Sequence, residues 1–280
     1  MLPSYVLALR EGLEAALIIG IVLGALKKID RSEYNRFVWY GAGLAIAVSL
    51  VTALIFYSVG ASFEGTAENI FEGLMMLLAA GVLTWMIFWM QLQAHNLKHE
   101  LEAGVHQAAS KNSQGALFAL AFFAVVREGV ELALFLTAAS FSSAAWQVII
   151  GGLLGVGTAV VLGYLLFATT VRLNLRQFFN VTSILLIFFA AGLVAHGVHE
   201  LIEASWIPAG IEQVWDTNPV LDEDSTLGLI LKTLFGYNGN PALVEVIAYS
   251  SYLVIVGIAV WVRSLLLKAS QRAENLAQIR

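Results

Sequence analysis

The sequence predicts an all-α membrane protein that crosses the bilayer seven times. Composition, the length of its apolar segments and the placement of its basic residues lead to this prediction. Of the 280 residues, 59% are hydrophobic and 12% are charged, whereas soluble domains carry about 25% charged residues. The mean hydropathy is +0.80. Charged side chains could not cover so apolar a chain in water, which excludes a soluble enzyme and a disordered protein.

Charge and cysteine content exclude further classes of protein. The net charge of −5 gives no basic surface for DNA or RNA, so no nucleic-acid partner is expected. The chain has no cysteine, which excludes disulfides, thiolate metal sites and cysteine nucleophiles.

Seven segments have the roughly 20 mainly apolar residues that a helix needs to cross the hydrocarbon core. The predicted spans are residues 4–26, 37–60, 70–90, 115–141, 147–169, 178–199 and 243–267. The first span has no basic n-region and contains three charges, so it is expected to be a retained helix and not a cleaved signal peptide. We expect a single transmembrane domain over residues 1–270 and a cytoplasmic tail over residues 271–280.

Lysine and arginine residues between the spans predict the orientation, because they are enriched in cytoplasmic connections. Twelve of the 15 basic residues lie in the first, third and fifth connections or at the C-terminal end, and only Lys232 lies on the opposite side. The N-terminus is therefore expected outside and the C-terminus in the cytoplasm. This alternation agrees with seven spans and predicts a multi-pass protein of the plasma or inner membrane, surrounded by lipid.

The two other basic residues, Arg10 and Arg127, lie inside spans and belong to a repeated motif. Residues 10–14 and 127–131 share the pattern Arg-Glu-Gly-apolar-Glu, and the copies are 117 residues apart. Because spans one and four are expected to run in opposite directions, the copies are antiparallel. Spans 1–3 and 4–6 therefore predict an inverted repeat, with span seven outside it. Many secondary transporters build a site between two such halves.

Charges at this depth must pair with one another or face water. Each costs about 2.5–3.5 kcal/mol at a helix centre, so the six motif charges would cost roughly 15–20 kcal/mol uncompensated. Arginine and the second glutamate of each motif are spaced i,i+4 and can pair. Gly12 and Gly129 remove side chains between the carboxylates and permit close helix approach. Ion pairs that merely lock two helices together are the alternative, but such pairs stabilise poorly compared with apolar packing.

The motif charges indicate a cation site near the pseudo-symmetry axis of the repeat. Four carboxylates and two guanidinium groups leave a net charge of −2. Carboxylates are hard oxygen ligands that suit Mg²⁺, Ca²⁺, Mn²⁺ or iron. The chemistry of the residues alone does not choose among these ions.

The motif pair resembles the paired Arg-Glu-x-x-Glu signature of the oxidase-dependent iron permease family, and most of all its bacterial Efe-type members. Further similar segments are Phe71-Glu72-Gly73, Leu83-Thr84-Trp85-Met86, Phe88-Trp89-Met90, Arg172-Leu173-Asn174-Leu175, Ala190-Ala191-Gly192-Leu193 and Phe235-Gly236-Tyr237. The resemblance covers nearly the whole chain through span seven. It implies seven transmembrane helices and a transporter, not an enzyme.

The resemblance also implies a substrate, ligands and partners. Iron, as Fe³⁺ or Fe²⁺, would be the transported substrate, and no organic cofactor is expected. The implied metal ligands are Glu11, Glu14, Glu128 and Glu131, with Arg10 and Arg127 as supporting ion-pair residues. The implied partners are extracellular iron-oxidising or periplasmic iron-handling proteins.

Polar residues on the outer side are candidates for an iron access route or a secondary metal site. They are Glu68 and Glu72 at the start of span three, and His199, Glu200 and Glu203 at the end of span six, where His196 shares the helical spacing. Acidic residues at a helix N-terminus also complement its dipole without any further function.

On the inner side, His95, His99 and His106 lie with Glu102 in a connection expected to be an amphipathic helix. The i,i+4 spacing of His95 and His99 is compatible with metal ligation. Trp39, Trp89 and Trp261 near span ends are interpreted as interface anchors.

Two alternatives to an iron permease remain at this stage. The first is a transporter of another divalent metal, such as Mn²⁺ or Pb²⁺. The second is an intramembrane di-iron enzyme, although the chain has only five histidines and neither motif has the Glu-x-x-His spacing of such sites.

Overall fold

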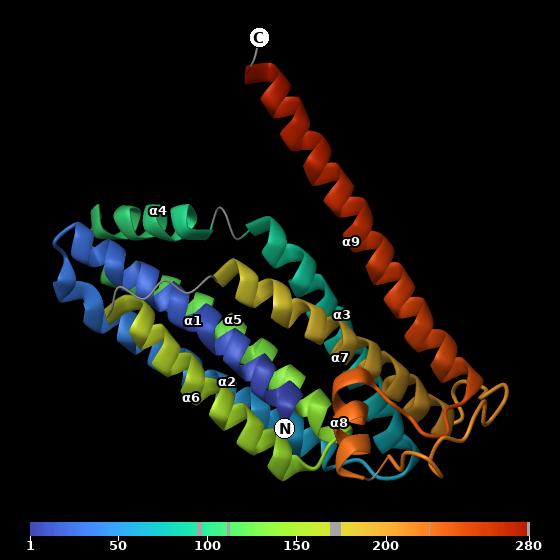
Figure 1. The fold of residues 1–280 in the computed structure, drawn as a ribbon. Helices are drawn as coiled ribbons and strands as arrows, with labels where there is room; N and C mark the ends of the chain where they lie inside the picture. Colours follow the sequence, from blue (N-terminus) through green and yellow to red (C-terminus); the bar gives the residue numbers. More distant parts are fainter. Residues whose placement is uncertain (94–96, 111–112, 169–174, 224, 279–280) are drawn as a thin grey trace.

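The protein is all-helical in a computed structural model that describes residues 1–93, 97–110, 113–168, 175–223 and 225–278, and no strand occurs among these residues (Figure 1). The elements in chain order are α1 (Leu2–Lys28), the 3₁₀ turn η1 (Ser32–Tyr34), α2 (Asn35–Gly60), α3 (Thr66–Gln93), α4 (Leu97–Ser110), α5 (Gln114–Phe141), α6 (Ala145–Ala168), α7 (Leu175–Glu203), α8 (Thr226–Phe235) and α9 (Leu243–Gln278). The predicted all-α class is confirmed.

Each predicted span corresponds to one long helix, namely α1, α2, α3, α5, α6, α7 or α9. Five of them, α2, α3, α6, α7 and α9, are long and apolar enough to cross a membrane. The other two, α1 and α5, are 27 and 28 residues long, but each carries the three charges of a motif. Helix α9 continues past the predicted span, so residues 271–278 of the predicted tail extend this helix.

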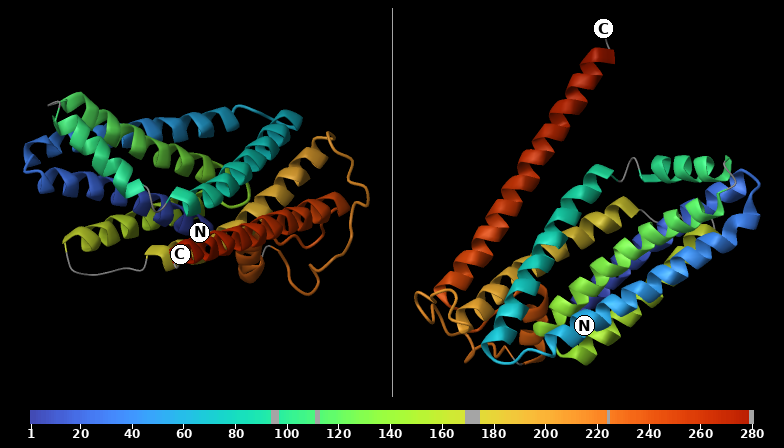
Figure 2. Two further views of the ribbon diagram at one scale, coloured as in Figure 1. Left: turned by 90° about the horizontal axis from the view of Figure 1, so that it is seen from above. Right: turned by 180° about the vertical axis from the view of Figure 1, so that it is seen from behind.

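The helices form two groups (Figures 1 and 2). In the first, α1 and α5 pack against each other in antiparallel orientation, with α6 beside α1 and α2 beside α5. In the second, α7 packs on α3, α8 and α9. The amphipathic helix α4 lies across the ends of α1 and α5, and the segment with α8 lies at the opposite end of the molecule (Figure 1).

Two apolar cores lie at different heights along α1 and α5. The first joins the N-terminal half of α1 and the C-terminal half of α5 to α3 and α7, and includes Leu7 and Phe135. The second joins the C-terminal half of α1 and the N-terminal half of α5 to α4, and includes Leu26, Val105 and Leu117. The charged motifs lie between these cores, so apolar packing closes the motif region above and below.

Large apolar side chains cover the outward faces of α2, α6 and α9. Leu54, Leu153 and Ile255 are exposed by 65%, 69% and 66%. A face of this kind is expected where helices contact lipid, because lipid replaces the apolar partner that a soluble protein would need.

The helix α8 was not predicted, although its ends carry recognisable signals. Ser225 accepts a hydrogen bond from the Gly228 N–H at the start, which is the preferred N-cap arrangement. Gly236 ends the helix with φ 67°, and its N–H donates to the last turn, as glycine commonly does at helix C-termini. Both signals lie in the connection between the sixth and seventh predicted spans.

Helices α3 and α7 approach closely at a pair of glycines. A Cβ atom on Gly73 would lie 2.8 Å from the carbonyl oxygen of Gly197, and one on Gly197 would lie 2.9 Å from the carbonyl oxygen of Gly73. These neighbours are backbone atoms and cannot turn aside. The close packing of α3 on α7 therefore requires that Gly73 and Gly197 have no side chains.

We expect Gly73→Ala to lower the thermal stability of the purified protein by several degrees, because overpacking of this kind costs about 1–3 kcal/mol. Gly81→Ala is the matched control on the same helix, since nothing lies within 4 Å of a Cβ at Gly81. Thermal unfolding in detergent, followed by size-exclusion chromatography, measures both variants. Equal melting temperatures for the two would contradict the packing described.

Candidate metal centre

The two repeated motifs lie opposite each other because α1 and α5 pack as antiparallel neighbours. The two motif glycines serve a different contact from the one predicted. A Cβ on Gly12 would lie 2.7 Å from Cβ of Ala159 on α6, and one on Gly129 would lie 2.6 Å from Cβ of Ser49 on α2. Each glycine thus allows its charged helix to approach a flanking helix, and the carboxylates project from other faces.

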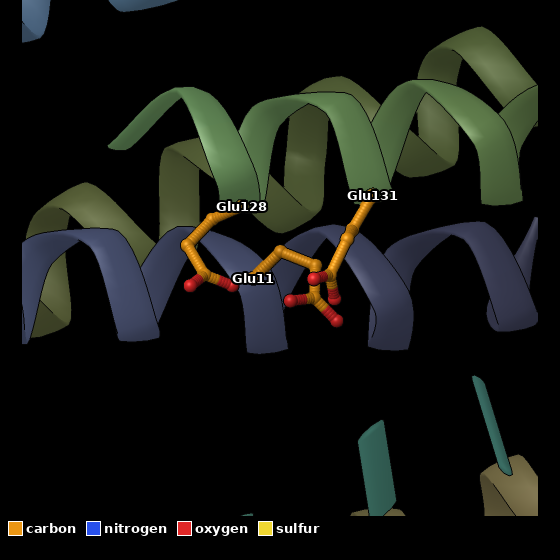
Figure 3. A group of neighbouring side chains, drawn as sticks. All are labelled: Glu11, Glu128 and Glu131. Carbon is orange, nitrogen blue, oxygen red and sulfur yellow. The ribbon is translucent and has the colours of Figure 1, made fainter. Parts of the chain in front are cut away.

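Three carboxylates from these two helices converge on one point. Glu11 extends from α1 toward Glu128 and Glu131, which extend from α5 (Figure 3). One ligand oxygen from each residue lies within 4.8 Å of the others. The exposed fractions are 1% for Glu11, 7% for Glu128 and 9% for Glu131. In the described part of the chain this is the one group of three such side chains with ligand atoms this close.

Both motif arginines form the i,i+4 ion pair that their spacing allows. Arg10 Nε lies 3.2 Å from Glu14 Oε1, and Arg127 Nε lies 2.9 Å from Glu131 Oε1. Glu14 lies outside the group of three carboxylates, and its side chain is 15% exposed. Among the four predicted ligands, the structure therefore brings together Glu11, Glu128 and Glu131, and places Glu14 on the next turn beside Arg10.

The ion pairs leave part of the negative charge uncompensated. Both carboxylate oxygens of Glu11 and Oε2 of Glu131 are buried and accept no hydrogen bond within the described residues. Buried acceptors in native proteins nearly always have a partner, and buried charges are paired or coordinate metals. Three convergent carboxylate oxygens form a ligand set for a hard cation.

Two tryptophans on α3 adjoin this centre. The Arg127 guanidinium carbon lies 4.0 Å from the ring centroid of Trp89 and 5.7 Å from that of Trp85. The interpretation of Trp89 as an interface anchor therefore missed its contact with the motif. The sequence feature that could have indicated this contact is the i,i+4 spacing of Trp85 and Trp89, which places both rings on one helix face.

The outer polar residues form a network around His199. His199 Nδ1 lies 2.9 Å from Glu245 Oε1, and His199 Nε2 lies 3.2 Å from Glu203 Oε1. Glu245 also accepts hydrogen bonds from Asn238 and from the Ala242 N–H. This network links the end of α7 to the start of α9, a connection that sequence reasoning missed because Glu245 lies 46 residues from His199.

The other predicted outer residues lie at the ends of the same helices. Glu68 is exposed in the first turn of α3, and Glu72 is partly buried one turn later, close enough to Glu200 of α7 for electrostatic interaction. His196 bonds the carbonyl oxygen of Gly192 on its own helix. Carboxylates from α3 and α7 thus meet at the end of the molecule that is predicted to lie outside.

On the side predicted to be cytoplasmic, His106 is exposed on α4, one turn after the partly buried Glu102. His95 and the side chain of His99 lie outside the described residues. The proposed ligation by the inner histidines remains a prediction.

Comparison with known proteins identifies the family. The model of the iron permease FTR1 family matches residues 1–274. The chain belongs to this family. The ferrous iron permease EfeU of Escherichia coli O6:K15:H31 is 37% identical over 256 residues, which cover 91% of this chain and 93% of that protein. EfeU of Shigella sonnei has the same values, and EfeU of Yersinia pestis is 34% identical over 91% of both chains. No solved structure matches the chain.

Membership of the FTR1 family decides between the classes left open by the sequence. Members are permeases and not enzymes, so the di-iron enzyme hypothesis is set aside. With five helices able to cross a bilayer, the FTR1 chain is a multi-pass protein of the cytoplasmic membrane. Iron is its substrate class, and the charged centre between α1 and α5 is the candidate place where iron binds.

The unequal burial of the two arginines predicts unequal effects on stability. The side chain of Arg10 is 0% exposed and that of Arg127 is 32% exposed. Removing one partner of a buried pair costs about 3–5 kcal/mol, and of an exposed pair far less. We therefore expect Arg10→Gln to lower the melting temperature more than Arg127→Gln, and Lys28→Gln, at an exposed position of α1, to have little effect. A larger loss for Arg127→Gln would contradict this assignment.

Proposed function

We propose that this FTR1 member imports iron across the cytoplasmic membrane and that Glu11, Glu128 and Glu131 bind the ion during transport. The observation that carries the proposal is the convergence of these three buried carboxylates, with oxygens that accept no hydrogen bond in the described residues. Glu14 completes the acidic set from the next turn of α1. Arg10 and Arg127 compensate part of the charge while the centre is empty.

The charge of the centre favours Fe²⁺ as the transported form. With all motif groups ionised, four carboxylates and two guanidinium groups carry a net charge of −2, which a divalent ion neutralises. The relatives from Escherichia coli and Yersinia pestis are named ferrous iron permeases. Both arguments support Fe²⁺, whereas Fe³⁺ would leave the loaded centre positively charged.

We also propose that α1 and α5 cross the membrane, which gives seven spans with the N-terminus outside and the C-terminus in the cytoplasm. At 27 and 28 residues, each is about 40 Å long, more than the roughly 30 Å hydrocarbon core. Their charges are compatible with this placement because α2 and α6 flank them and the motif residues face the interior. The basic connections support the orientation.

The contacts between helices support the inverted repeat. The α1–α6 and α2–α5 contacts are the most extensive between helices. In the proposed repeat α1 corresponds to α5 and α2 to α6, so these two contacts are equivalent. A Cβ on Gly151 of α6 would meet Ser4 Cβ of α1 at 3.1 Å, and one on Gly41 of α2 would meet Ala121 Cβ of α5 at 3.2 Å. Ser4 and Ala121 are 117 residues apart, the same separation as Arg10 and Arg127.

Iron is proposed to approach the centre from the outer end of α3 and α7. Glu68, Glu72 and Glu200 concentrate negative charge there, which raises the local concentration of a cation. His199 and Glu203 hold the neighbouring end of α7 and remain candidates for a secondary metal site. An external iron-handling protein, the partner that the family resemblance implies, would deliver iron on this side, where residues 204–242 form the long connection between α7 and α9.

The carboxylate centre is tested by neutral, isosteric substitutions. We expect Glu11→Gln, Glu128→Gln and Glu131→Gln each to reduce iron uptake by at least tenfold, because each removes a charged ligand from the convergent set. Glu64→Gln is the control, since Glu64 is exposed between α2 and α3. Uptake of radioactive iron into proteoliposomes is normalised to the amount of inserted protein. Wild-type uptake by any of the three variants would exclude that residue as a ligand.

The substrate is tested by uptake at a controlled oxidation state. We expect uptake of Fe²⁺ kept reduced with ascorbate to exceed that of chelated Fe³⁺, because a divalent ion matches the charge of the centre. Unlabelled Mn²⁺ and Pb²⁺ are added as competitors in the same assay. Preferential uptake of Fe³⁺ would overturn the ferrous assignment, and stronger transport of Mn²⁺ or Pb²⁺ would identify a different divalent substrate.

A further inference from the structure

The two copies of the motif have different surroundings. The Arg10 side chain is enclosed, whereas the Arg127 side chain is about one-third exposed. Two indole rings of α3 lie against Arg127, with its guanidinium carbon 4.0 Å from the Trp89 centroid. These rings stack on each other with centroids 5.9 Å apart and an angle of 27° between them. Arg127 therefore has both space and an aromatic surface beside it.

Glu131 takes part in two interactions that compete for its negative charge. Its Oε1 accepts the hydrogen bond from Arg127 Nε at 2.9 Å, and the same carboxylate belongs to the convergent group of three. A metal ion bound by Glu131, whose Oε2 has no partner among the described residues, draws negative charge from this carboxylate and so weakens its pair with Arg127. A guanidinium that loses its counter-ion in apolar surroundings is unfavourable, so the displaced group needs another partner.

We propose that Trp89, with Trp85 stacked on it, is a positioning residue that holds the Arg127 guanidinium when the metal takes Glu131. This inference rests on the proposed carboxylate site. The negative face of an indole attracts a cation, and it attracts an unpaired cation more strongly than one already neutralised by a carboxylate. The rings therefore stabilise the metal-bound centre relative to the empty one.

The location of Arg127 gives the displacement a direction. Arg127 precedes Glu131 by one turn, toward the end of α5 that is proposed to face the cytoplasm, whereas Arg10 precedes Glu14 toward the outer end of α1. The enclosed Arg10 thus lies toward the outside, where iron would enter, and the more exposed Arg127 lies toward the cytoplasm, where iron would be released. Return of Arg127 to Glu131 would compete with the ion and promote its release inward.

The test measures anaerobic binding of Fe²⁺ to the purified full-length protein by calorimetry. We expect Trp89→Leu to weaken binding about tenfold, which corresponds to about 1.4 kcal/mol, and Trp89→Phe to weaken it less because a ring face remains. Trp39→Leu is the control, since Trp39 is a tryptophan of α2 that is 57% exposed, whereas Trp89 is half-buried. Unchanged binding by Trp89→Leu would overturn the proposal.

A second measurement separates the proposed role from simple packing. In an Arg127→Gln background there is no cation to hold, so adding Trp89→Leu should leave the Fe²⁺ affinity unchanged. A further loss of similar size would show that Trp89 acts by packing alone and would overturn the inference, while the carboxylate site would stand. Absence of Fe²⁺ binding by the wild-type protein would instead overturn the proposed function itself.

Discussion

Compensation of the charges inside the motif helices is the constraint on which the arrangement of the whole chain depends. Arg10, Glu11 and Glu14 on α1 and their counterparts on α5 cannot face lipid without a large free-energy cost. The two helices therefore lie inside the bundle and face each other, and the flanking positions are occupied by α2 and α6. These flanking helices carry few charges and present apolar side chains outward. The packing of four helices thus follows from the need to keep six charges together.

Compensation is incomplete, and this gives the centre its proposed chemistry. Each arginine pairs with the second glutamate of its own motif. The first glutamate of each motif, Glu11 or Glu128, takes no part in these two ion pairs and lies near Glu131. An arrangement built only for stability would pair every charge or replace the set with apolar residues. The surplus of carboxylate oxygens is what a transported cation would neutralise.

The sequence predicted the helices and the motif pairs because both depend on local patterns. Apolar segment length is readable from the chain, and i,i+4 spacing fixes which arginine meets which glutamate on one helix. The contacts between helices were less predictable. Gly12 and Gly129 face α6 and α2 rather than the space between the carboxylates, and Glu245 reaches His199 from 46 residues away. Such partners depend on helix rotation and crossing, which sequence spacing within one helix does not determine.

The arginines also limit the charge that the protein must carry when no ion is bound. Without them the empty centre would hold four negative charges, and with them it holds two. Binding of a divalent ion then brings the net charge to zero, so the loaded centre is the less costly state in the bilayer. Apolar cores close the centre on both sides. Because the empty centre retains a net negative charge, binding of a cation is favoured over leaving the centre vacant.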